Sequence, residues 1–198
     1  MFVTFEGIDG SGKSTQAELL RARLEVDGYD VVATREPGGT ELGERIRELL
    51  LHGGHVSPWA EALLYAASRA QHVDEVIRPA LERGAWVVCD RYVDSSVAYQ
   101  GVGRSLGLER VLDLNLSAVG GLMPDRTFLL ALDVAELRGR LPGDHDRLER
   151  ESGDFHARVS SGYEELATRF PERIFVLDAA LPPERIAEEV YGALRVRA

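Results

Sequence analysis

Residues Gly7 to Ser14 have the types and spacing of a loop that binds phosphate. The segment Gly7-Ile8-Asp9-Gly10-Ser11-Gly12-Lys13-Ser14 follows the pattern glycine, four residues, glycine, lysine and serine. Glycines let backbone N–H groups curl around an anion, and a helix that follows directs its positive N-terminal end at that anion. We therefore predict a nucleotide phosphate site made of Gly7, Ile8, Asp9, Gly10, Ser11, Gly12, Lys13, Ser14 and Thr15.

Lys13 is the single lysine among the 23 basic residues of the chain, and the other 22 are arginine. A compact ammonium at this one place indicates a steric requirement, because the wider fork of an arginine would fit the curled loop poorly. We expect Lys13 to contact the phosphate groups that react.

Two oxygen ligands for a magnesium ion are predicted beside the loop. Ser14 offers a hydroxyl, and Asp90 follows the apolar run Ala85 to Cys89, so its carboxylate would enter the same crevice. Mg²⁺ is a hard cation that prefers oxygen and bridges nucleotide phosphates. An acidic residue followed by arginine is also an ordinary structural pair, so that alternative for Asp90 stays open.

These residues lie within an alternation of strand-like and helix-like segments. Short β-branched or aromatic runs predict five strands, at Phe2 to Phe5, Asp30 to Ala33, Ala85 to Cys89, Arg126 to Ala131 and Arg173 to Leu177. Helical patterns cover Lys13 to Val26, Glu41 to Leu51, Pro58 to Arg83, Glu109 to Ala118, Gly153 to Arg169 and Pro183 to Val196. The predicted fold class is therefore α/β, with a five-stranded parallel sheet, helices on both faces and ligands at the carboxyl ends of the strands.

Local signals add three expectations about the helices and loops. Ser57 is predicted to cap the helix that begins at Pro58. Pro79 falls inside that helix and is expected to kink or divide it. The charged stretch from about residue 138 to 151, which contains Pro142 and Gly143, is predicted to be a mobile lid.

Length and composition favour one domain, residues 1–198, with 44% hydrophobic and 28% charged residues, and the lack of signal-peptide features favours a cytoplasmic location. The net charge of −10 disfavours binding to a nucleic acid polymer or an anionic membrane. The apolar runs are too short to cross a bilayer, and Met1 leads into a strand pattern without the features of a signal peptide. The single cysteine, Cys89, is expected to belong to the core.

The sequence resembles the thymidylate kinase family along nearly its whole length. The resemblance is carried by Phe5-Glu6-Gly7 to Ser14, Thr34-Arg35-Glu36-Pro37-Gly38-Gly39-Thr40, Asp90-Arg91-Tyr92, Ser95 to Gly101 and Asp146-Arg147-Leu148-Glu149. It implies a P-loop kinase fold and transfer of the γ-phosphoryl group of ATP to dTMP, giving dTDP and ADP in dTTP biosynthesis. It also implies Mg²⁺ as a cofactor and a homodimer.

The same resemblance implies how dTMP is held. Tyr65 matches an aromatic position that stacks on thymine, where the family more often has phenylalanine, and Arg69 follows at i+4 to bond the carbonyl edge of the base. Gln100 has an amide that donates and accepts, as thymine requires, and Tyr99 resembles the residue that crowds the ribose 2′ position. The residues implied for substrate binding are Asp9, Glu36, Arg47, Tyr65, Arg69, Arg91, Ser96, Tyr99 and Gln100.

Catalysis is expected to depend on positive charge. The acceptor phosphate is already ionised near neutral pH, so the main demand is to stabilise charge on two approaching phosphates. By resemblance Arg91 and Arg47 grip the acceptor phosphate with Arg35 close by, and Asp9 holds Arg91 or the sugar 3′-hydroxyl. The loop has no arginine between Gly7 and Gly12, so lid arginines are expected to enter on closure. The predicted catalytic residues are Asp9, Lys13, Arg35, Arg91, Arg138 and Arg147.

Three alternatives share the phosphate loop. The nearest is a kinase of another nucleoside monophosphate, or of a non-nucleotide acceptor such as shikimate. A GTPase switch is disfavoured because the chain has no Asn-Lys-x-Asp motif. A binding module without turnover is disfavoured because the candidate catalytic residues are intact.

Overall fold

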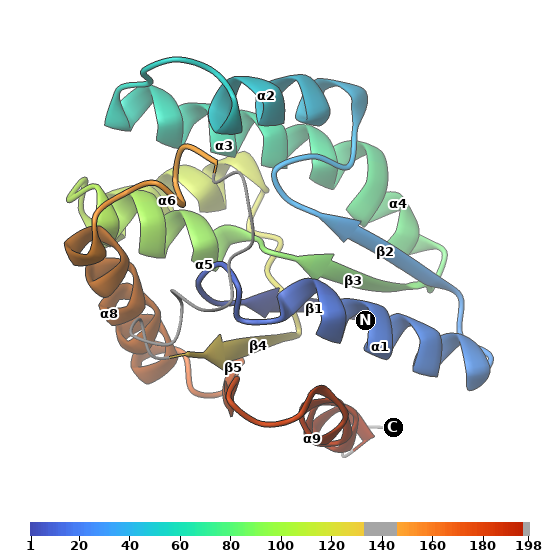
Figure 1. The fold of residues 1–198 in the computed structure, drawn as a ribbon. Helices are drawn as coiled ribbons and strands as arrows, with labels where there is room; N and C mark the ends of the chain where they lie inside the picture. Colours follow the sequence, from blue (N-terminus) through green and yellow to red (C-terminus); the bar gives the residue numbers. More distant parts are fainter. Residues whose placement is uncertain (133–145, 196–198) are drawn as a thin grey trace.

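The computed structural model describes residues 1–132 and 146–195, and in this part of the chain five parallel strands form one sheet (Figure 1). The strand order is β2-β3-β1-β4-β5, so β1 lies at the centre and pairs with β3 and β4. The strands are β1 (Phe2–Glu6), β2 (Val31–Arg35), β3 (Trp86–Asp90), β4 (Arg126–Ala131) and β5 (Ile174–Asp178). The predicted α/β class with a five-stranded parallel sheet is confirmed.

Four strands extend one or two residues past their predicted carboxyl ends, and the added residues include Glu6, Arg35 and Asp90. The ladder continues through these polar residues, with Glu6 opposite Leu129 and Arg35 opposite Asp90. Strand pairing uses backbone hydrogen bonds, so a strand can continue beyond the apolar residues from which it was predicted. Charged residues therefore lie together at the carboxyl ends of β1, β2 and β3.

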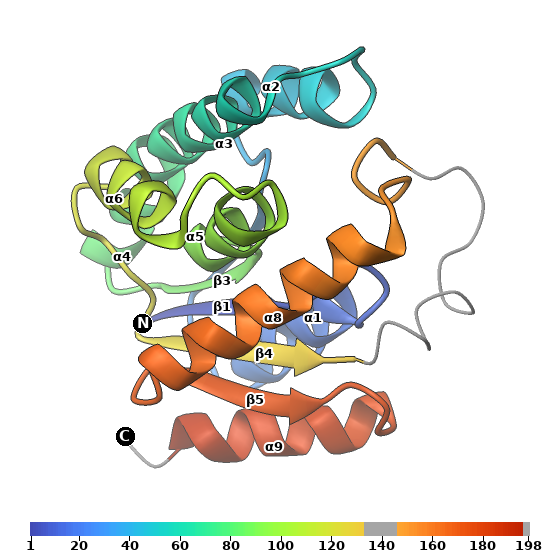
Figure 2. The same ribbon diagram turned by 90° about the vertical axis from the view of Figure 1, so that its left-hand side faces the viewer.

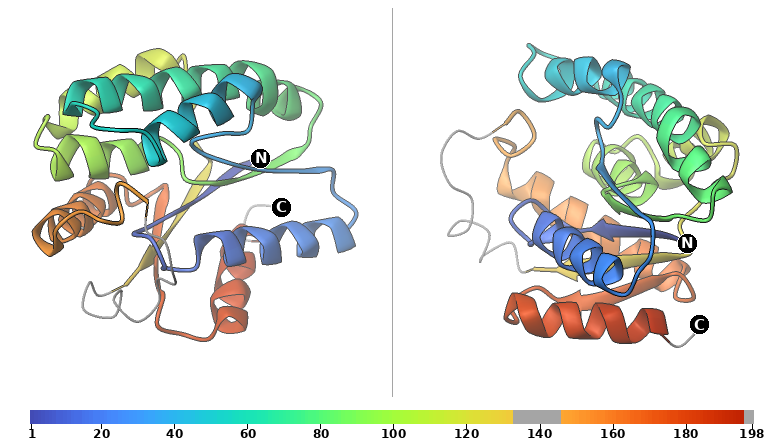
Figure 3. Two further views of the ribbon diagram at one scale, coloured as in Figure 1. Left: turned by 45° about the horizontal axis from the view of Figure 1, so that its top comes forward. Right: turned by 90° about the vertical axis from the view of Figure 1, so that its right-hand side faces the viewer.

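Helices cover both faces of the sheet, with α8 on one face and α1 on the other (Figures 2 and 3). Helices α1 and α9 also pack against each other. The α-helices are α1 (Lys13–Val26), α2 (Glu41–Leu51), α3 (Pro58–His72), α4 (Arg78–Glu82), α5 (Val93–Ser96), α6 (Leu108–Ala118), α8 (Gly153–Arg169) and α9 (Pro183–Arg195), and two π-helical segments are η1 (Val73–Ile77) and η2 (Val97–Gly103). The predicted end of the last helix, Val196, lies outside the described residues.

Proline divides the predicted third helix, as expected. The π-helical turn η1 separates α3 from α4, and Pro79 lies in the first turn of α4. Because proline has no N–H, it cannot continue the regular hydrogen-bond ladder of the preceding turn.

The predicted cap at Ser57 is wrong in its chemistry, although Ser57 does occupy the N-cap position. Its side chain makes no capping hydrogen bond, and only its backbone carbonyl takes part, accepting from the Glu61 N–H at 2.9 Å. The Ser57 side chain is exposed, so water can satisfy it. A side-chain cap is found instead on α2, where Thr40 Oγ1 accepts from the Gly43 N–H at 2.9 Å.

The helical stretch formed by α5 and η2 is absent from the predicted elements. Its glycines have low helix propensity, and packing against α8 stabilises it instead. The approach is close: a Cβ placed on Gly162 of α8 would lie 3.1 Å from the Ala98 Cα, and one on Gly103 would lie 2.9 Å from the Phe155 ring. This contact brings α8 next to the carboxyl end of the sheet.

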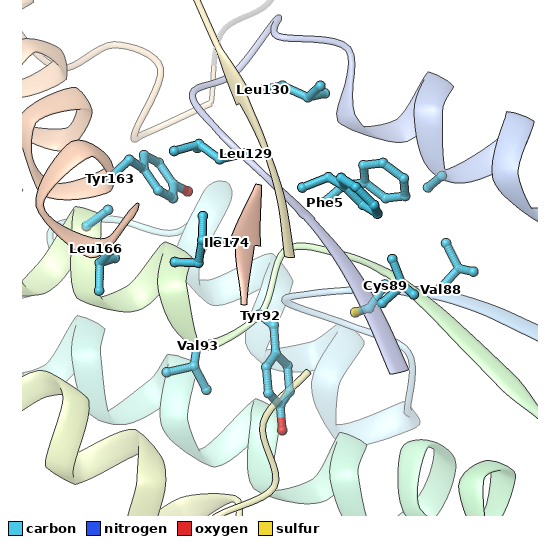
Figure 4. Packing of buried hydrophobic residues seen from close by; sticks show 14 of the residues in the cluster. Phe5, Val88, Cys89, Tyr92, Val93, Leu129, Leu130, Tyr163, Leu166 and Ile174 are labelled. Carbon is cyan, nitrogen blue, oxygen red and sulfur yellow. The ribbon is translucent and has the colours of Figure 1, made fainter. Parts of the chain in front are cut away.

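The core lies between the sheet and its helices, and it includes Phe5, Leu129, Leu130 and Tyr163 (Figure 4). Cys89 is buried there as expected, and burial raises the pKa of its thiol well above the usual range. None of the described helices is both long enough and apolar enough to cross a bilayer.

Candidate active site

The loop between β1 and α1 has the backbone shape of an anion cradle. Gly7, Gly10 and Gly12 have φ values of 137°, 75° and 95°, which glycine adopts without strain. A Cβ on Gly7 would lie 2.6 Å from the Leu130 carbonyl oxygen, so this position also has no room for a side chain. The loop and the start of α1 line a cavity that we call the phosphate pocket, which includes Gly10, Gly12, Lys13, Ser14, Thr15, Asp90 and Arg91.

Lys13 lines the phosphate pocket and is 6% exposed. Its Nζ donates to the Ile8 carbonyl oxygen at 2.8 Å and lies 4.0 Å from Asp9 Oδ1. Burial and the charge of Arg91 lower the pKa of Lys13 to about 8, although Asp9 and Asp90 oppose the shift. A bound polyphosphate would supply further negative charge and so favour the ammonium form.

Ser14 and Asp90 meet at the mouth of the loop. The Ser14 hydroxyl donates to Asp90 Oδ2 at 2.5 Å, although the residues are 76 positions apart in the chain. Both offer oxygen to a hard cation, which fits Mg²⁺. Within residues 1–132 and 146–195, no group of three or more His, Cys, Asp or Glu residues could hold a metal ion. A cation here would therefore take its remaining ligands from nucleotide phosphates and water.

Arg91 lines both the phosphate pocket and a second, neighbouring cavity. Its backbone has a φ of 70°, and its side chain is 14% exposed. Its Nη2 donates to Asp9 Oδ1 at 2.5 Å, and its Nη1 donates to the Gly7 carbonyl oxygen at 2.9 Å. Burial opposes ionisation of Asp9, but the charges of Arg91 and Lys13 outweigh it and hold the pKa of Asp9 well below its usual range. Asp9 and Arg91 thus form the pair that the resemblance implied.

A buried carboxylate behind Arg91 was not identified as functional from the sequence. Glu6 Oε2 accepts from the Ser95 hydroxyl at 2.5 Å and from the Tyr163 hydroxyl at 3.0 Å. Both hydroxyls also accept from Arg91 Nη1, at 3.0 and 3.3 Å respectively. Burial and the charge of Asp94 raise the pKa of Glu6 to about 7. Tyr163 comes from α8, 72 positions from Arg91, so no local spacing indicates this network.

The second cavity, which we call the acceptor pocket, brings together every residue that the resemblance implied for substrate binding. Its lining includes Asp9, Glu36, Arg47, Tyr65, Arg69, Arg91, Ser96, Tyr99 and Gln100. Tyr99 lies beside the Asp9–Arg91 pair, because its hydroxyl donates to Asp9 Oδ2 at 3.0 Å and Arg91 lies over its ring at 5.2 Å from the centroid.

Arg69 is 1% exposed, and most of its donors are already used. Its Nε donates to Glu36 Oε2 at 2.6 Å and its Nη1 donates to the Ser96 hydroxyl at 2.9 Å. Further hydrogen bonds run from Nη1 to the Asn115 side chain and from Nη2 to the Tyr92 carbonyl oxygen. A guanidinium has five N–H groups, and among the described residues the fifth one, on Nη2, has no acceptor.

Glu36 lines the acceptor pocket, and there its carboxylate holds the Arg69 guanidinium in place. Besides its bond from Arg69, its Oε1 lies 2.9 Å from His72 Nδ1. His72 and Asn115 were not predicted as site residues, and they enter from α3 and α6 through tertiary packing.

Two further predicted arginines, Arg47 and Arg35, differ in their exposure. Arg47 is half-buried, donates to the Pro37 carbonyl oxygen at 2.9 Å and lines both pockets. Arg35 has a side chain that is 54% exposed and pairs with Glu44, with 3.0 Å between Arg35 Nη2 and Glu44 Oε1. Arg35 lines the phosphate pocket.

The predicted lid is described only from residue 146 onward. Arg138 lies outside the described residues, as do residues 139–145. Arg147 lies beside the acceptor pocket rather than at the loop: its Nε donates to the Leu50 carbonyl oxygen at 2.8 Å and its Nη1 lies 2.7 Å from Glu61 Oε2. Its entry to the phosphates on closure stays a prediction.

A third cavity adjoins the loop on another side and was not predicted from the sequence. It shares Gly12 and Thr15 with the phosphate pocket but has no lining residue in common with the acceptor pocket. Its far wall is the segment 179–183 after β5, which is joined to α1 by a hydrogen bond of 2.9 Å from Gln16 Nε2 to the Pro183 carbonyl oxygen. We call it the side pocket.

Comparisons with known proteins agree on one family. The thymidylate kinase family profile matches residues 5–190. The chain is 57% identical to thymidylate kinase from Clavibacter sepedonicus, over 99% of this chain and 95% of that protein. It is 50% identical to thymidylate kinase from Synechococcus sp. (strain JA-3-3Ab), over 100% of this chain and 96% of that protein. The crystal structure of thymidylate kinase from Ehrlichia chaffeensis is similar, with a TM-score of 0.82, 36% identity and 98% coverage of both chains.

Proposed function

The chain belongs to the thymidylate kinase family, and from this premise we propose how its residues phosphorylate dTMP. It is an ATP-dependent phosphotransferase. The observation that carries the proposed residue roles is that the acceptor and phosphate pockets share Asp9, Glu36, Arg47 and Arg91. A nucleotide in each pocket would therefore place its phosphate against the same guanidinium groups, which is the geometry that phosphoryl transfer between two anions needs.

The donor is ATP, with its phosphates in the loop and Lys13 against them. The side pocket supports a place for the adenosine end, because it opens from the same loop without touching the acceptor pocket. Ser14 and Asp90 would hold Mg²⁺, which when bound neutralises charge on the phosphates.

The acceptor dTMP lies with its base on Tyr65 and its phosphate toward Arg91 and Arg47. The Nη2 N–H of Arg69 that has no acceptor within residues 1–132 and 146–195 bonds a carbonyl of thymine, and the Ser96 hydroxyl supports Arg69 from the side. Tyr99 packs where the ribose would lie, in contact with Asp9. In this arrangement Glu36 acts through Arg69, which it holds at 2.6 Å.

The transfer step needs charge stabilisation and the exclusion of water. Arg91 and Lys13 present positive charge from fixed, largely buried positions, so little reorganisation accompanies the reaction. We expect residues 138–151 to form a lid. Its closure would bring Arg138 and Arg147 to the phosphoryl group that is transferred and would shield that group from water. We also expect the enzyme to work as a homodimer in the cytoplasm.

Purified protein with ATP and Mg²⁺ should form ADP and dTDP fastest with dTMP. The assay compares dTMP with UMP, CMP, GMP and AMP in coupled ADP measurements, with the product nucleotide separated by chromatography. Equal or better turnover of another acceptor would favour the nearest alternative, a kinase of a different nucleoside monophosphate. ATP binding without acceptor-dependent turnover would leave only a binding module.

A further inference from the structure

We propose that Glu61 determines the preference for thymine over cytosine by fixing which way the Gln100 amide faces. The inference rests on the proposed function, because it takes Gln100 to face the base of the acceptor nucleotide. Glu61 itself does not line the acceptor pocket and is a positioning residue.

Glu61 lies on α3, one turn before Tyr65 and two turns before Arg69, and is fully buried. Its Oε1 accepts from Gln100 Nε2 at 2.8 Å. Arg104 pairs with Glu61 Oε2 at 3.2 Å, and Arg147 does so at 2.7 Å. Two guanidinium groups thus supply the positive charge that a buried carboxylate requires.

The carboxylate permits one orientation of the Gln100 amide. An ionised carboxylate has no hydrogen to donate, so only the NH₂ end of the amide can lie against Glu61 Oε1. The opposite orientation would set two oxygens against each other at the present 2.8 Å separation. Gln100 Oε1 is therefore turned away from Glu61.

Gln100 Oε1 is available to a ligand. Among the described residues none donates a hydrogen bond to it, yet it is not one of the enclosed polar atoms that lack a partner. Gln100 lines the acceptor pocket, and its Oε1 is turned away from Glu61, so in the proposed arrangement this oxygen faces the bound base. Within one pocket, the proposed site thus offers an acceptor from Gln100 and a donor from Arg69.

That order of acceptor and donor matches the edge of thymine. Thymine presents an N3–H next to the O4 carbonyl, so the N3–H donates to Gln100 Oε1 and O4 accepts from Arg69. Cytosine presents a bare N3 lone pair next to an amino group, so both contacts would be mismatched. Sites built to bond a particular polar group reject analogues that leave their own groups unpaired. Uracil shares the thymine edge, so this device does not separate dTMP from dUMP.

Glu61→Gln is the direct test, because the neutral amide accepts either orientation of Gln100. The measured quantity is the ratio of kcat/KM for dTMP to kcat/KM for dCMP. This ratio should fall about 10- to 100-fold, the scale of one wrongly paired buried group. If the substitution acted instead through Arg147 and closure of the lid, kcat/KM would fall equally for dTMP and dCMP, and the ratio would not change.

Glu151→Gln is the matched control. Glu151 Oε1 pairs with Arg104 Nη1 at 2.6 Å but does not contact Gln100, so its loss should leave the ratio at the wild-type value. Glu61→Asp is the second variant: it keeps the charge beside both arginines while drawing the oxygen back from the Gln100 amide, and it should lower the ratio partially. Thermal unfolding establishes which variants are folded.

A wild-type ratio in folded Glu61→Gln would overturn the inference. If Glu61→Gln does not fold, a wild-type ratio in Glu61→Asp would overturn it instead. Failure of the proposed function looks different: wild-type enzyme would then show no preference for dTMP over dCMP before any substitution.

Discussion

Replacing Arg91 by alanine is expected to lower kcat/KM for dTMP by about 10³-fold or more, the scale found when an arginine that stabilises phosphoryl transfer is removed. Arg91 lines both pockets, and its guanidinium is fixed by Asp9, Gly7 and the two hydroxyls that Glu6 holds. Its removal also leaves Asp9 without its main counter-charge next to an incoming phosphate. Steady-state kinetics with dTMP as the varied substrate measure the loss.

Two further variants test whether the loss of activity in Arg91→Ala is specific to Arg91 and whether positive charge alone restores it. Arg91→Lys keeps the charge but not the planar fork, so it should recover only a small part of the activity. Arg45→Ala removes an arginine whose side chain is 75% exposed and should leave kcat/KM unchanged. A folded Arg91→Ala enzyme that retains more than a tenth of wild-type kcat/KM would remove Arg91 from the mechanism.

Replacing Lys13 by arginine is expected to lower kcat by about 10²- to 10³-fold even though the charge is retained, the scale found for loss of one preorganised electrostatic contact. Nζ fits within the curl of the loop, at 2.8 Å from the Ile8 carbonyl oxygen, and the side chain is 7% exposed. A guanidinium is larger and planar, so it must displace either the loop backbone or the phosphates. Rates at saturating ATP and dTMP measure the effect.

An arginine-to-lysine substitution elsewhere on α1 is the control for Lys13→Arg. Arg23→Lys changes an arginine whose side chain is 56% exposed, and the rate should not change. Measuring ATP affinity separately shows whether Lys13→Arg fails in binding or in turnover. Wild-type kcat in Lys13→Arg would show that the lone lysine is not a steric requirement of the loop.

Contiguous motifs made much of the site predictable from the sequence. The glycines, Lys13 and Ser14 of the loop follow one another, and backbone geometry alone sets their relation. Tyr65 and Arg69 are one helical turn apart, so their common face also follows from the sequence. Asp90 was placed by the sheet, because the carboxyl ends of neighbouring parallel strands share an edge.

The buried carboxylates were not predictable in the same way. Glu36 was identified only through the resemblance, and Glu6 and Glu61 were not identified at all. Glu6 supports Arg91 through the Ser95 and Tyr163 hydroxyls and Glu61 bonds Gln100, so their hydrogen-bond partners lie 39 or more positions away. In a sequence such residues look like ordinary solvated charges, since burial depends on tertiary packing. A signal did exist for Glu61, because the i, i+4, i+8 spacing of Glu61, Tyr65 and Arg69 places all three on one face of α3.

The helix that carries Ser96, Tyr99 and Gln100 was missed for a related reason. Its glycines oppose helix formation locally, and its stability comes from contact with α8, which lies far along the chain. The functional positions in it were identified by resemblance, whereas the structure explains why small residues are needed there: Gly103 and Gly162 allow the two helices to touch.

A crystal structure of the enzyme with dTMP bound tests the arrangement of the two pockets most directly. The thymine ring should lie against Tyr65 with its N3 edge at Gln100, and the dTMP phosphate should lie within hydrogen-bonding distance of the Arg91 guanidinium, facing the loop. A base stacked away from Tyr65 and Gln100, or a phosphate held apart from Arg91, would contradict the proposed alignment of acceptor and donor.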